Sequence, residues 1–259
     1  MGFNAFIRAV KRGETPVYRL LRSLAKLVTS PHIPRVPRFL KPPLRVLYEA
    51  HYGFITLGRL FITVFYRHPL FQARCASVGK GLSIDGLPYV SGHTEIHIGD
   101  NVWLGGRIGI FSGRMIEHPR LIIKDYAELG WNVQITVSKE VIIEEHARVS
   151  FDCRISDSDG HPREADLRAQ NCPPKLEDIR PVRICRDAWI GNGTHIMKGV
   201  TIGEGAVIGA NSVVISDIPA FSLAMGNPAE VFFHNFGRPS KKAPAGAAGN
   251  GEIAQEQKA

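Results

Sequence analysis

Branched aliphatic residues recur at every sixth position through most of this chain. The longest unbroken series begins at residue 184, and a glycine directly follows three of its members. The aliphatic positions of this series are Ile184, Ile190, Ile196, Ile202, Ile208 and Val214. Residues spaced six apart fall on no single stripe of an α-helix, so the pattern excludes an amphipathic helix. A fixed six-residue repeat predicts a parallel β-helix, in which each short strand points one aliphatic side chain inward.

Shorter blocks of the same repeat lie upstream, between residues 78 and 155. Their aliphatic positions are Val78, Ile84, Val90, Ile98, Leu104, Ile110, Ile123, Leu129, Ile135, Ile143, Val149 and Ile155. Together with the longer series they make eighteen hexapeptides, which at three strands a coil predict about six coils. One repeat cannot bury its own aliphatic residue, whereas stacked repeats bury a continuous column. We therefore expect a mainly β chain whose insertions leave the repeat at its turns.

The first 75 residues differ from the rest of the chain in charge. They contain thirteen Lys or Arg residues against two acidic residues, a balance of +11, whereas the whole chain carries +8. Residues 76–259 must then sum to −3, so the basic character belongs to the N-terminal segment alone. Apolar helices interrupted by prolines suit a lipid surface better than a nucleic-acid groove, and we expect no nucleic-acid partner.

Prolines divide this N-terminal segment into two stretches with helical character. Residues 15–29 place leucines on one side and basic residues around the other, which predicts a basic amphipathic helix. Residues 44–66 are more apolar, but their uninterrupted apolar runs are shorter than the ~20 residues that cross a bilayer. Both stretches suit the interface of an anionic membrane, and we expect peripheral membrane contact through residues 1–75. The alternative is that they cap the open end of the β-helix or contact neighbouring subunits.

The remaining composition completes the predicted domain organisation. No secretory signal is visible in the sequence. The four cysteines lack the spacing of a metal site, which predicts free thiols in a reducing cytoplasm. These cysteines are Cys75, Cys153, Cys172 and Cys185. From Gly237 the chain is rich in Gly, Ala, Pro, Lys and Gln, which predicts a disordered tail. We expect a basic helical segment at 1–75, a β-helix at 76–236 with a loop at 156–183, and a tail at 237–259.

The long break in the repeat, between Ile155 and Ile184, is the most informative insertion. Twenty-eight residues separate these two positions. A long loop that leaves a strict repeat is more often functional than idle. The loop contains His161 between Gly160 and Pro162, and these neighbours suit an imidazole held at a set angle. An imidazole titrates near neutral pH and can act as a base; the alternative is a solvated loop histidine.

Four motifs around this loop together resemble a known family. They are Gly160-His161-Pro162, Asp187-Ala188-Trp189-Ile190-Gly191, the repeat at 199–214 and Gly226-Asn227-Pro228-Ala229. The combination is similar to the hexapeptide-repeat acyltransferases, and most similar to their maltose, galactoside and polysaccharide O-acetyltransferase branch. The close match covers residues 143–232, and residues 1–75 lie outside it. The resemblance implies a left-handed β-helix, a homotrimer, and an active site in the cleft between subunits with acetyl-CoA as acyl donor.

The resemblance also implies roles for individual residues. His161 would be the general base that takes the proton from the acceptor hydroxyl as its oxygen attacks the thioester carbonyl. Residues expected beside coenzyme A are Trp189, Asn192, Ala210, Ile215 and Ser216. Residues expected near the acceptor are Trp131, Asn132 and Asp159. Apart from the resemblance, Asp157 or Asp159 could orient the imidazole by accepting from its second ring nitrogen. The alternatives are core filling for Trp189 and turn formation for Asn132 and both aspartates.

The sequence departs from the family where coenzyme A phosphates would bind. Relatives often have basic residues at the positions of Ser216, Glu230 and Phe233, and this chain has none of them. The cations left as candidates are Lys198, Arg238, Lys241 and Lys242.

Two other functions compete with acetyl transfer. One is a non-catalytic trimeric scaffold with membrane-binding arms, and an intact His161 motif argues against it. The other is a metalloenzyme similar to the γ-class carbonic anhydrases, but the histidine spacing supplies no ligand triad and we expect no metal. The histidines concerned are His93, His97, His118, His146 and His195. We expect an acetyl-CoA-dependent O-acetyltransferase that modifies a lipid-linked sugar of an envelope polysaccharide or glycolipid, at the cytoplasmic face of the inner membrane.

Overall fold

The structure is a computed structural model that describes residues 3–29 and 36–238 of the chain. It separates into two compact units, Met1–Gly58 and Arg59–Ala259. The tail predicted at 237–259 lies almost wholly outside the described residues.

Helices form the described part of the N-terminal segment up to residue 74. In order they are α1 (Phe3–Arg12), α2 (Pro16–Thr29), a 3₁₀ turn (Arg38–Leu40), α3 (Lys41–Ile62), a π-helical turn (Thr63–Arg67) and α4 (His68–Arg74). The helices expected at 15–29 and 44–66 are confirmed as α2 and α3. The helix α1 was not predicted, although its apolar residues have helical spacing.

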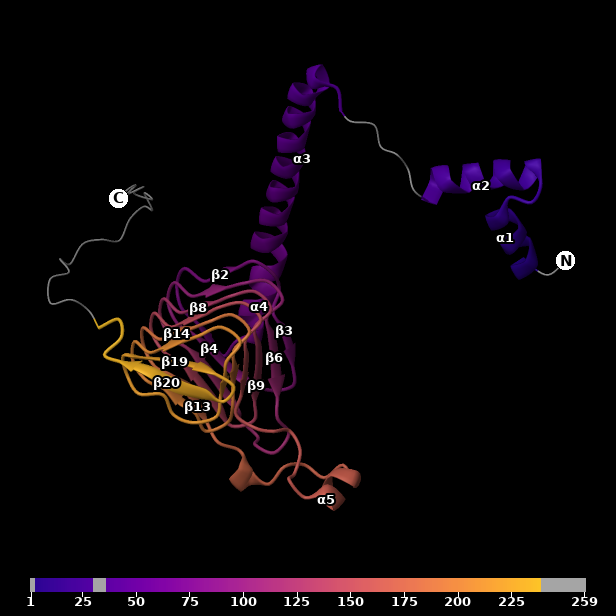
Figure 1. Ribbon diagram of the computed structural model, residues 1–259. Helices are drawn as coiled ribbons and strands as arrows, with labels where there is room; N and C mark the ends of the chain where they lie inside the picture. Colours follow the sequence, from indigo (N-terminus) through magenta and orange to yellow (C-terminus); the bar gives the residue numbers. More distant parts are fainter. Residues whose placement is uncertain (1–2, 30–35, 239–259) are drawn as a thin grey trace, which may run out of the picture. The chain divides into compact units, whose positions relative to one another are not determined.

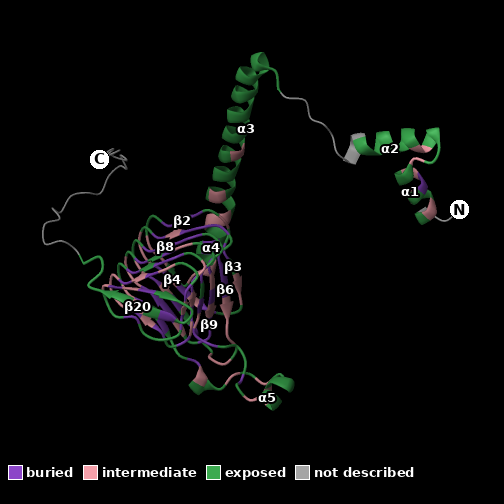
Figure 2. Cartoon of the chain, viewed as in Figure 1, coloured by how far each residue is buried: buried purple, intermediate pink, exposed green. Residues whose placement is uncertain are grey.

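Most of the described apolar side chains of α2 and α3 are exposed. On α2, Val17, Leu20 and Leu24 are 63%, 61% and 51% exposed, and α3 contains no buried residue (Figure 2). Among the helices that the structure describes, none is long and apolar enough to span a bilayer.

The six-residue repeat forms three sheets whose strands wind into six coils (Figure 1). The first sheet comprises β1 (Ser77–Val78), β4 (Glu95–Ile98), β7 (Arg120–Ile123), β10 (Glu140–Ile143), β13 (Val182–Ile184) and β16 (Thr201–Ile202). The second comprises β2 (Ser83–Ile84), β5 (Trp103–Leu104), β8 (Glu128–Leu129), β11 (Arg148–Val149), β14 (Trp189–Ile190), β17 (Val207–Ile208), β19 (Ser222–Gly226) and β20 (Ala229–His234). The third comprises β3 (Tyr89–Ser91), β6 (Gly109–Ser112), β9 (Gln134–Val137), β12 (Arg154–Ser156), β15 (His195–Ile196) and β18 (Val213–Val214). All pairings are parallel except that of β19 with β20, which closes the last coil.

The core is the stack of aliphatic side chains that the repeat predicts. The register places Ile143 beside Ile184 and Ile184 beside Ile202, and all three side chains are fully buried. Equivalent columns run inside the other two sheets. The predicted parallel β-helix of about six coils is therefore confirmed.

The last N-terminal helix, α4, caps the first coil. Its Phe71 is 1% exposed and belongs to the core cluster. The side chains of His68 and Arg74 hydrogen-bond carbonyl oxygens of the first coil, on Leu82 and Gly92 respectively. This capping helix lies outside the stretches 15–29 and 44–66, for which capping was the alternative to membrane contact.

The three corners of the coil differ in how the chain turns. The first corner joins the first and second sheets, and the second corner joins the second and third. Both turn tightly through a residue with positive φ, such as Asn101 at the first corner and Asn132 at the second. The third corner, between the third and first sheets, carries the loops 113–119 and 157–181. The longer loop contains α5 (Ala165–Ala169) and a 3₁₀ turn (Leu176–Asp178).

Candidate active site

The two loops of the third corner enclose a cavity of about 620 Å³. Its walls come from both loops and from strand ends of the third sheet. The lining residues are Ser112, Gly113, Arg114, Met115, Thr136, Ser138, Ser158, Gly160, His161, Asn171, Cys172, Pro173, Pro174 and Ile179. The lining combines hydroxyl groups, an apolar wall and the imidazole of His161, which suits a polar molecule with hydrophobic faces such as a sugar.

His161 lies on the cavity wall near the start of the longer loop. The Gly160 N–H donates to the hydroxyl of Ser158 at 3.1 Å, and Gly160 has a φ of +77°. Pro162, directly after the histidine, is buried and fixes the chain on that side. The exposed ring of His161 has no hydrogen-bond partner within the described part of the chain. Both ring nitrogens are therefore free to bond a molecule in the cavity, as a general base requires.

Asp157 holds the backbone of the neighbouring coil. Its side chain is fully buried, and its two carboxylate oxygens accept the N–H groups of Ser138, Lys139 and Glu140 at 2.6, 2.6 and 2.9 Å. Burial raises the pKa of Asp157 above its ordinary value, while these N–H donors act in the opposite direction. The geometry agrees with turn formation, the alternative to orienting the imidazole.

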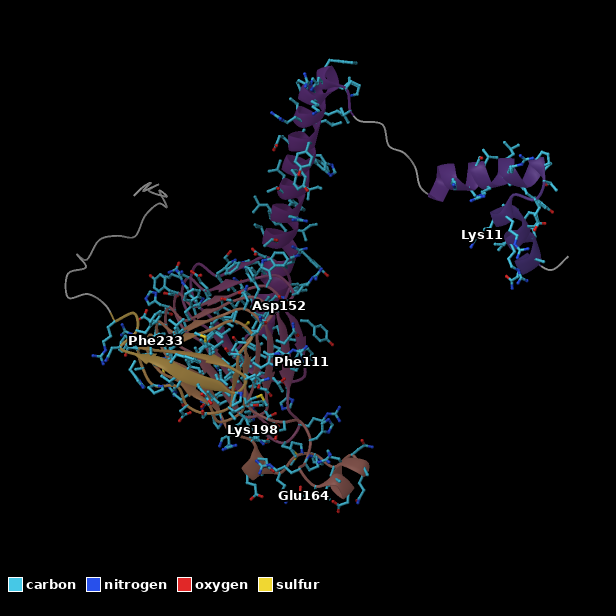
Figure 3. The ribbon with its side chains drawn as sticks, viewed as in Figure 1. Lys11, Phe111, Asp152, Glu164, Lys198 and Phe233 are labelled. Carbon is cyan, nitrogen blue, oxygen red and sulfur yellow. The ribbon has the colours of Figure 1, made fainter. Side chains whose placement is uncertain are left out.

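Asp159 and Lys198 form an ion pair at the base of the longer loop. Figure 3 labels Lys198. Lys198 is 8% exposed, and its Nζ lies 2.5 Å from Asp159 Oδ2 and 3.8 Å from Asp178 Oδ1. Asp178 also pairs with Arg163 at 3.1 Å. Lys198 is held by these carboxylates, and its role at the coenzyme A phosphates stays a prediction. Asp159 bonds Lys198 and does not line the cavity, so its role at the acceptor stays a prediction.

The second corner holds most of the other predicted site residues. Asn132 has a φ of +60° and donates to Asp152 at 2.7 Å, which agrees with its alternative as a turn residue. Trp131 is 44% exposed and donates to Asp85 at 3.0 Å. Asn192 and Ala210 are exposed at this corner one coil apart.

Trp189 projects from β14 on the outer face of the second sheet. It is 52% exposed, so it does not fill the core, and its indole N–H donates to the Ser150 hydroxyl at 3.2 Å. Ile215 and Ser216 are exposed at the third corner, after β18. Within one chain the structure therefore does not bring Trp131, Asn132, Asn192 or Ala210 into the cavity of His161.

The remaining candidate groups are dispersed. Among the described residues no three His, Cys, Asp or Glu side chains lie close enough to hold a metal ion. Of the histidines considered as ligands, His118 pairs with Glu95 and His146 stacks on Tyr126. The four cysteines are free, and burial raises the pKa of Cys153 to about 11. Arg238 lies over the Phe221 ring, whereas Lys241 and Lys242 lie outside the described residues.

The shorter loop contributes cavity residues that were not predicted from the sequence. Arg114 and Met115 line the cavity from this loop. A signal was present, because Ile110 and Ile123 stand thirteen positions apart where the repeat requires six. The repeat shows that residues are inserted here, but it does not show which of them meet the longer loop.

Comparisons with known proteins agree with the repeat. The family model of the bacterial transferase hexapeptide repeats matches residues 181–216. A candidate acetyltransferase of Saccharomyces cerevisiae is 33% identical over 138 residues, which cover 53% of this chain and 55% of that protein. A candidate acetyltransferase of Staphylococcus aureus is 53% identical over 56 residues, covering 22% of this chain and 28% of that protein. The chain thus spans about half of the yeast relative and about a quarter of the staphylococcal one.

A solved structure shows the same fold. The N-acyltransferase AntD from Bacillus cereus, in complex with dTDP-4-amino-4,6-dideoxyglucose and coenzyme A, superposes with a TM-score of 0.55. The match covers 67% of this chain and 91% of AntD at 18% sequence identity. The likeness confirms the fold class expected from the sequence, a left-handed parallel β-helix.

Proposed function

The chain is a hexapeptide-repeat protein of the bacterial transferase type, and from this premise we propose that it transfers an acetyl group from acetyl-CoA to a sugar hydroxyl. The position of His161 carries the proposal, because it places an unbonded imidazole on the wall of a cavity large enough for a sugar. The relatives named as acetyltransferases support the reaction class, and the AntD complex supports coenzyme A as the carrier.

His161 would perform the proton transfers of this reaction. An alcohol is a weak nucleophile at neutral pH, so a base must take its proton as the oxygen attacks the thioester carbonyl carbon. The imidazole would accept that proton at one ring nitrogen. It would return the proton to the sulfur when the carbon–sulfur bond breaks, which leaves the base neutral for the next cycle. Acetyl-CoA would supply the acetyl thioester.

The second corner offers a surface for the coenzyme A arm. Asn192 and Ala210 are exposed there one coil apart, and an added Cβ on Gly191 would lie 2.7 Å from the backbone of Ala210. Consecutive coils are therefore in close contact, with short side chains, and an extended pantetheine could lie along them. Trp189 and the exposed Ile215 and Ser216 are further candidate contacts.

A homotrimer would complete the site. His161 lies at the third corner and the candidate coenzyme A residues lie mainly at the second, so one chain presents two halves. We propose that the third corner of one subunit faces the second corner of the next, which brings both halves together. Analytical ultracentrifugation should then give the mass of three chains, and a monomer that turns over acetyl-CoA would contradict the arrangement.

The acceptor is proposed to be lipid-linked and held at the cytoplasmic face of a membrane. The support is the exposed apolar surface of α2 and α3 together with the +11 balance of residues 1–75. A surface-confined acceptor and a surface-bound enzyme would meet without diffusing through the cytoplasm. A scaffold without catalysis remains the competing proposal.

Replacing His161 tests the proposed base. We expect His161→Ala to lower kcat for acetyl transfer by about 10²- to 10⁴-fold, because the hydroxyl loses its base, with little change in the KM of acetyl-CoA. Turnover would be measured with a panel of free and lipid-linked sugars. His234→Ala removes an exposed histidine at the end of β20 and serves as the control. Wild-type turnover in the His161 variant would disprove the assigned base, and a wild-type protein inactive on every acceptor would favour the scaffold.

A further inference from the structure

Arg114 is an unpaired cation in the wall of the cavity. It is exposed on the shorter loop and lines the same cavity as His161. Its guanidinium forms no hydrogen bond or ion pair with any residue that the structure describes. No carboxylate is present among the residues that line the cavity. The only fixed charge of the lining is therefore positive.

Most cations of the longer loop already have partners, and the exposed Arg180, whose guanidinium has none within the described residues, does not line the cavity. Arg163 pairs with Asp178 at 3.1 Å, and Lys175 pairs with Glu164 at 2.5 Å. Arg168 donates to the carbonyl oxygen of Pro162 at 3.1 Å. Lys198 is held by two carboxylates, as described above. Arg114 thus keeps its donors for a molecule that enters the cavity.

The loop that carries Arg114 is anchored on both sides of it. The Gly113 N–H donates to the carbonyl oxygen of Val137 at 2.8 Å. Farther along, His93 Nε2 lies 3.0 Å from the carbonyl oxygen of Ile116, and His118 pairs with Glu95 at 2.8 Å. These bonds fix the loop backbone, so the guanidinium is presented from a defined position.

We propose that Arg114 binds an anionic group of the acceptor, so that the substrate is an acidic or phosphorylated sugar. The inference rests on the proposed acetyl transfer and names its substrate class. A guanidinium binds a carboxylate or a phosphate through two parallel N–H···O bonds, which also orients the molecule. The apolar wall of Met115, Pro173 and Pro174 would contact a face of the sugar ring, and the anion would direct one hydroxyl toward His161.

Acetyl transfer to matched sugars tests this proposal. Glucose, glucuronic acid and glucose 6-phosphate would be compared as acceptors for the full chain, with calorimetric titration of each sugar in the presence of coenzyme A. We expect wild-type protein to prefer one of the two anionic sugars, and the pair distinguishes a carboxylate from a phosphate. Arg114→Ala should raise the KM and the Kd of that sugar by about 10- to 100-fold, the usual effect of losing a charged hydrogen bond.

Two further variants separate charge from recognition. Arg114→Lys keeps the charge without the guanidinium fork and should recover only part of the affinity. Arg154→Ala removes an exposed arginine from β12, outside the cavity, and should leave the preference intact. The KM of acetyl-CoA should not change in either Arg114 variant. A rise in that KM would show that Arg114 serves the phosphates of coenzyme A and would overturn the proposal.

The same measurements distinguish the role of Arg114 from the acetyl-transfer reaction itself. Equal turnover and binding of the neutral and anionic sugars by wild-type protein would overturn the role of Arg114 while leaving acetyl transfer in place. Anion binding that depends on Arg114, without acetyl transfer to any sugar, would support the site and overturn the reaction. Absence of anion binding in the wild-type titration would also overturn the role of Arg114.

Discussion

Two ionisable residues four positions apart at the third corner have opposite environments. Asp157 is buried and accepts three backbone N–H groups, whereas His161 is exposed on the cavity wall. The first residue holds the coil in place where the loop leaves it. Because the start of the loop is fixed in this way, His161 is held at the cavity wall. A structural role and the proposed chemical role are therefore adjacent in the sequence.

Replacement of Asp157 should destabilise the fold. Asp157→Ala leaves three N–H groups without an acceptor, and we expect the free energy of unfolding to fall by about 2–4 kcal/mol in a urea titration followed by tryptophan fluorescence. Asp157→Asn keeps one oxygen acceptor, so its free energy of unfolding should lie between those of the alanine variant and wild type.

A matched aspartate at the same corner provides the control for this measurement. Asp217 is exposed and accepts a single N–H group, from Thr201 at 2.7 Å. Asp217→Ala should cost about 1 kcal/mol or less. Equal losses for Asp157→Ala and Asp217→Ala would show that the buried oxygens do not hold the coil.

The sequence could predict the placement of a residue only where its immediate neighbours in the chain determine it. His161 could be placed on the loop because a glycine and a proline flank it where the chain leaves a strict repeat, and its role as base stays a prediction. The pair of Asp159 with Lys198 joins residues 39 positions apart, and the path of the intervening loop decides it. No periodicity governs that path, so the sequence did not predict that Lys198 pairs with Asp159. The position of Arg114 in the cavity was unpredictable for the same reason.

Both loops that form the cavity leave the β-helix at one corner. At the second corner the Asn132 N–H donates to the carbonyl oxygen of Gly106 at 2.8 Å, so adjacent coils are joined through their turns. An insertion there would break that bond. The third corner is held by side chains such as Asp157, and extra residues can leave it without disturbing the strands. The spacing predicted this shared corner in principle, since each break follows the third strand of a coil.

The pair between Lys198 and Asp159 should anchor the longer loop. In Lys198→Met both Asp159 and Asp178 lose their cation, although Asp178 keeps Arg163. We expect amide hydrogen exchange across residues 157–181 to accelerate on the order of tenfold, while the strands exchange as in wild type. The kcat of acetyl transfer should fall in parallel, because His161 is carried by the same loop.

An exposed pair in the same loop distinguishes anchoring from a general effect of charge. Lys175→Met removes the pair with Glu164, whose side chains are 47% and 40% exposed. Exposed pairs contribute little, so exchange and kcat should stay near wild type. Unchanged exchange in Lys198→Met would contradict the anchoring role.

At the scale of the whole molecule, the repeat determined the β-helix and its coil number. Every coil uses the same small set of interactions, so a local pattern repeated along the chain specifies a global structure. The N-terminal segment has no such repeat. Its composition predicted helices and a charge balance, but not that α4 would cap the first coil.

The proposed membrane contact of the N-terminal segment can be tested on α2 without removing the cap. Arg19→Glu with Arg22→Glu reverses two charges on α2 in the full chain. We expect this variant to bind vesicles of phosphatidylglycerol and phosphatidylcholine at least about tenfold more weakly than wild type, since each basic residue near an anionic surface contributes about 1 kcal/mol. Cosedimentation at two salt concentrations would measure the partition.

The controls for membrane contact follow from the same electrostatics. Wild-type binding to vesicles of pure phosphatidylcholine should be weak, and added salt should weaken binding to the anionic vesicles. Arg154→Glu with Arg107→Glu places the same reversal on the β-helix and should have a smaller effect. Equal sedimentation of wild type and the α2 variant would remove the support for a membrane-bound enzyme.

The helix α4 also bears on how this molecule avoids polymerising. A stack of coils ends in unpaired strand edges, and such an edge can template a further chain until a fibre grows. Phe71 covers the apolar interior at that end, and His68 and Arg74 bond carbonyl groups that an incoming strand would need. A chain that begins after residue 75 would lack α4 and expose this edge. Loss of the apolar helices would raise its solubility, but end-to-end association of the exposed edges would lower it again.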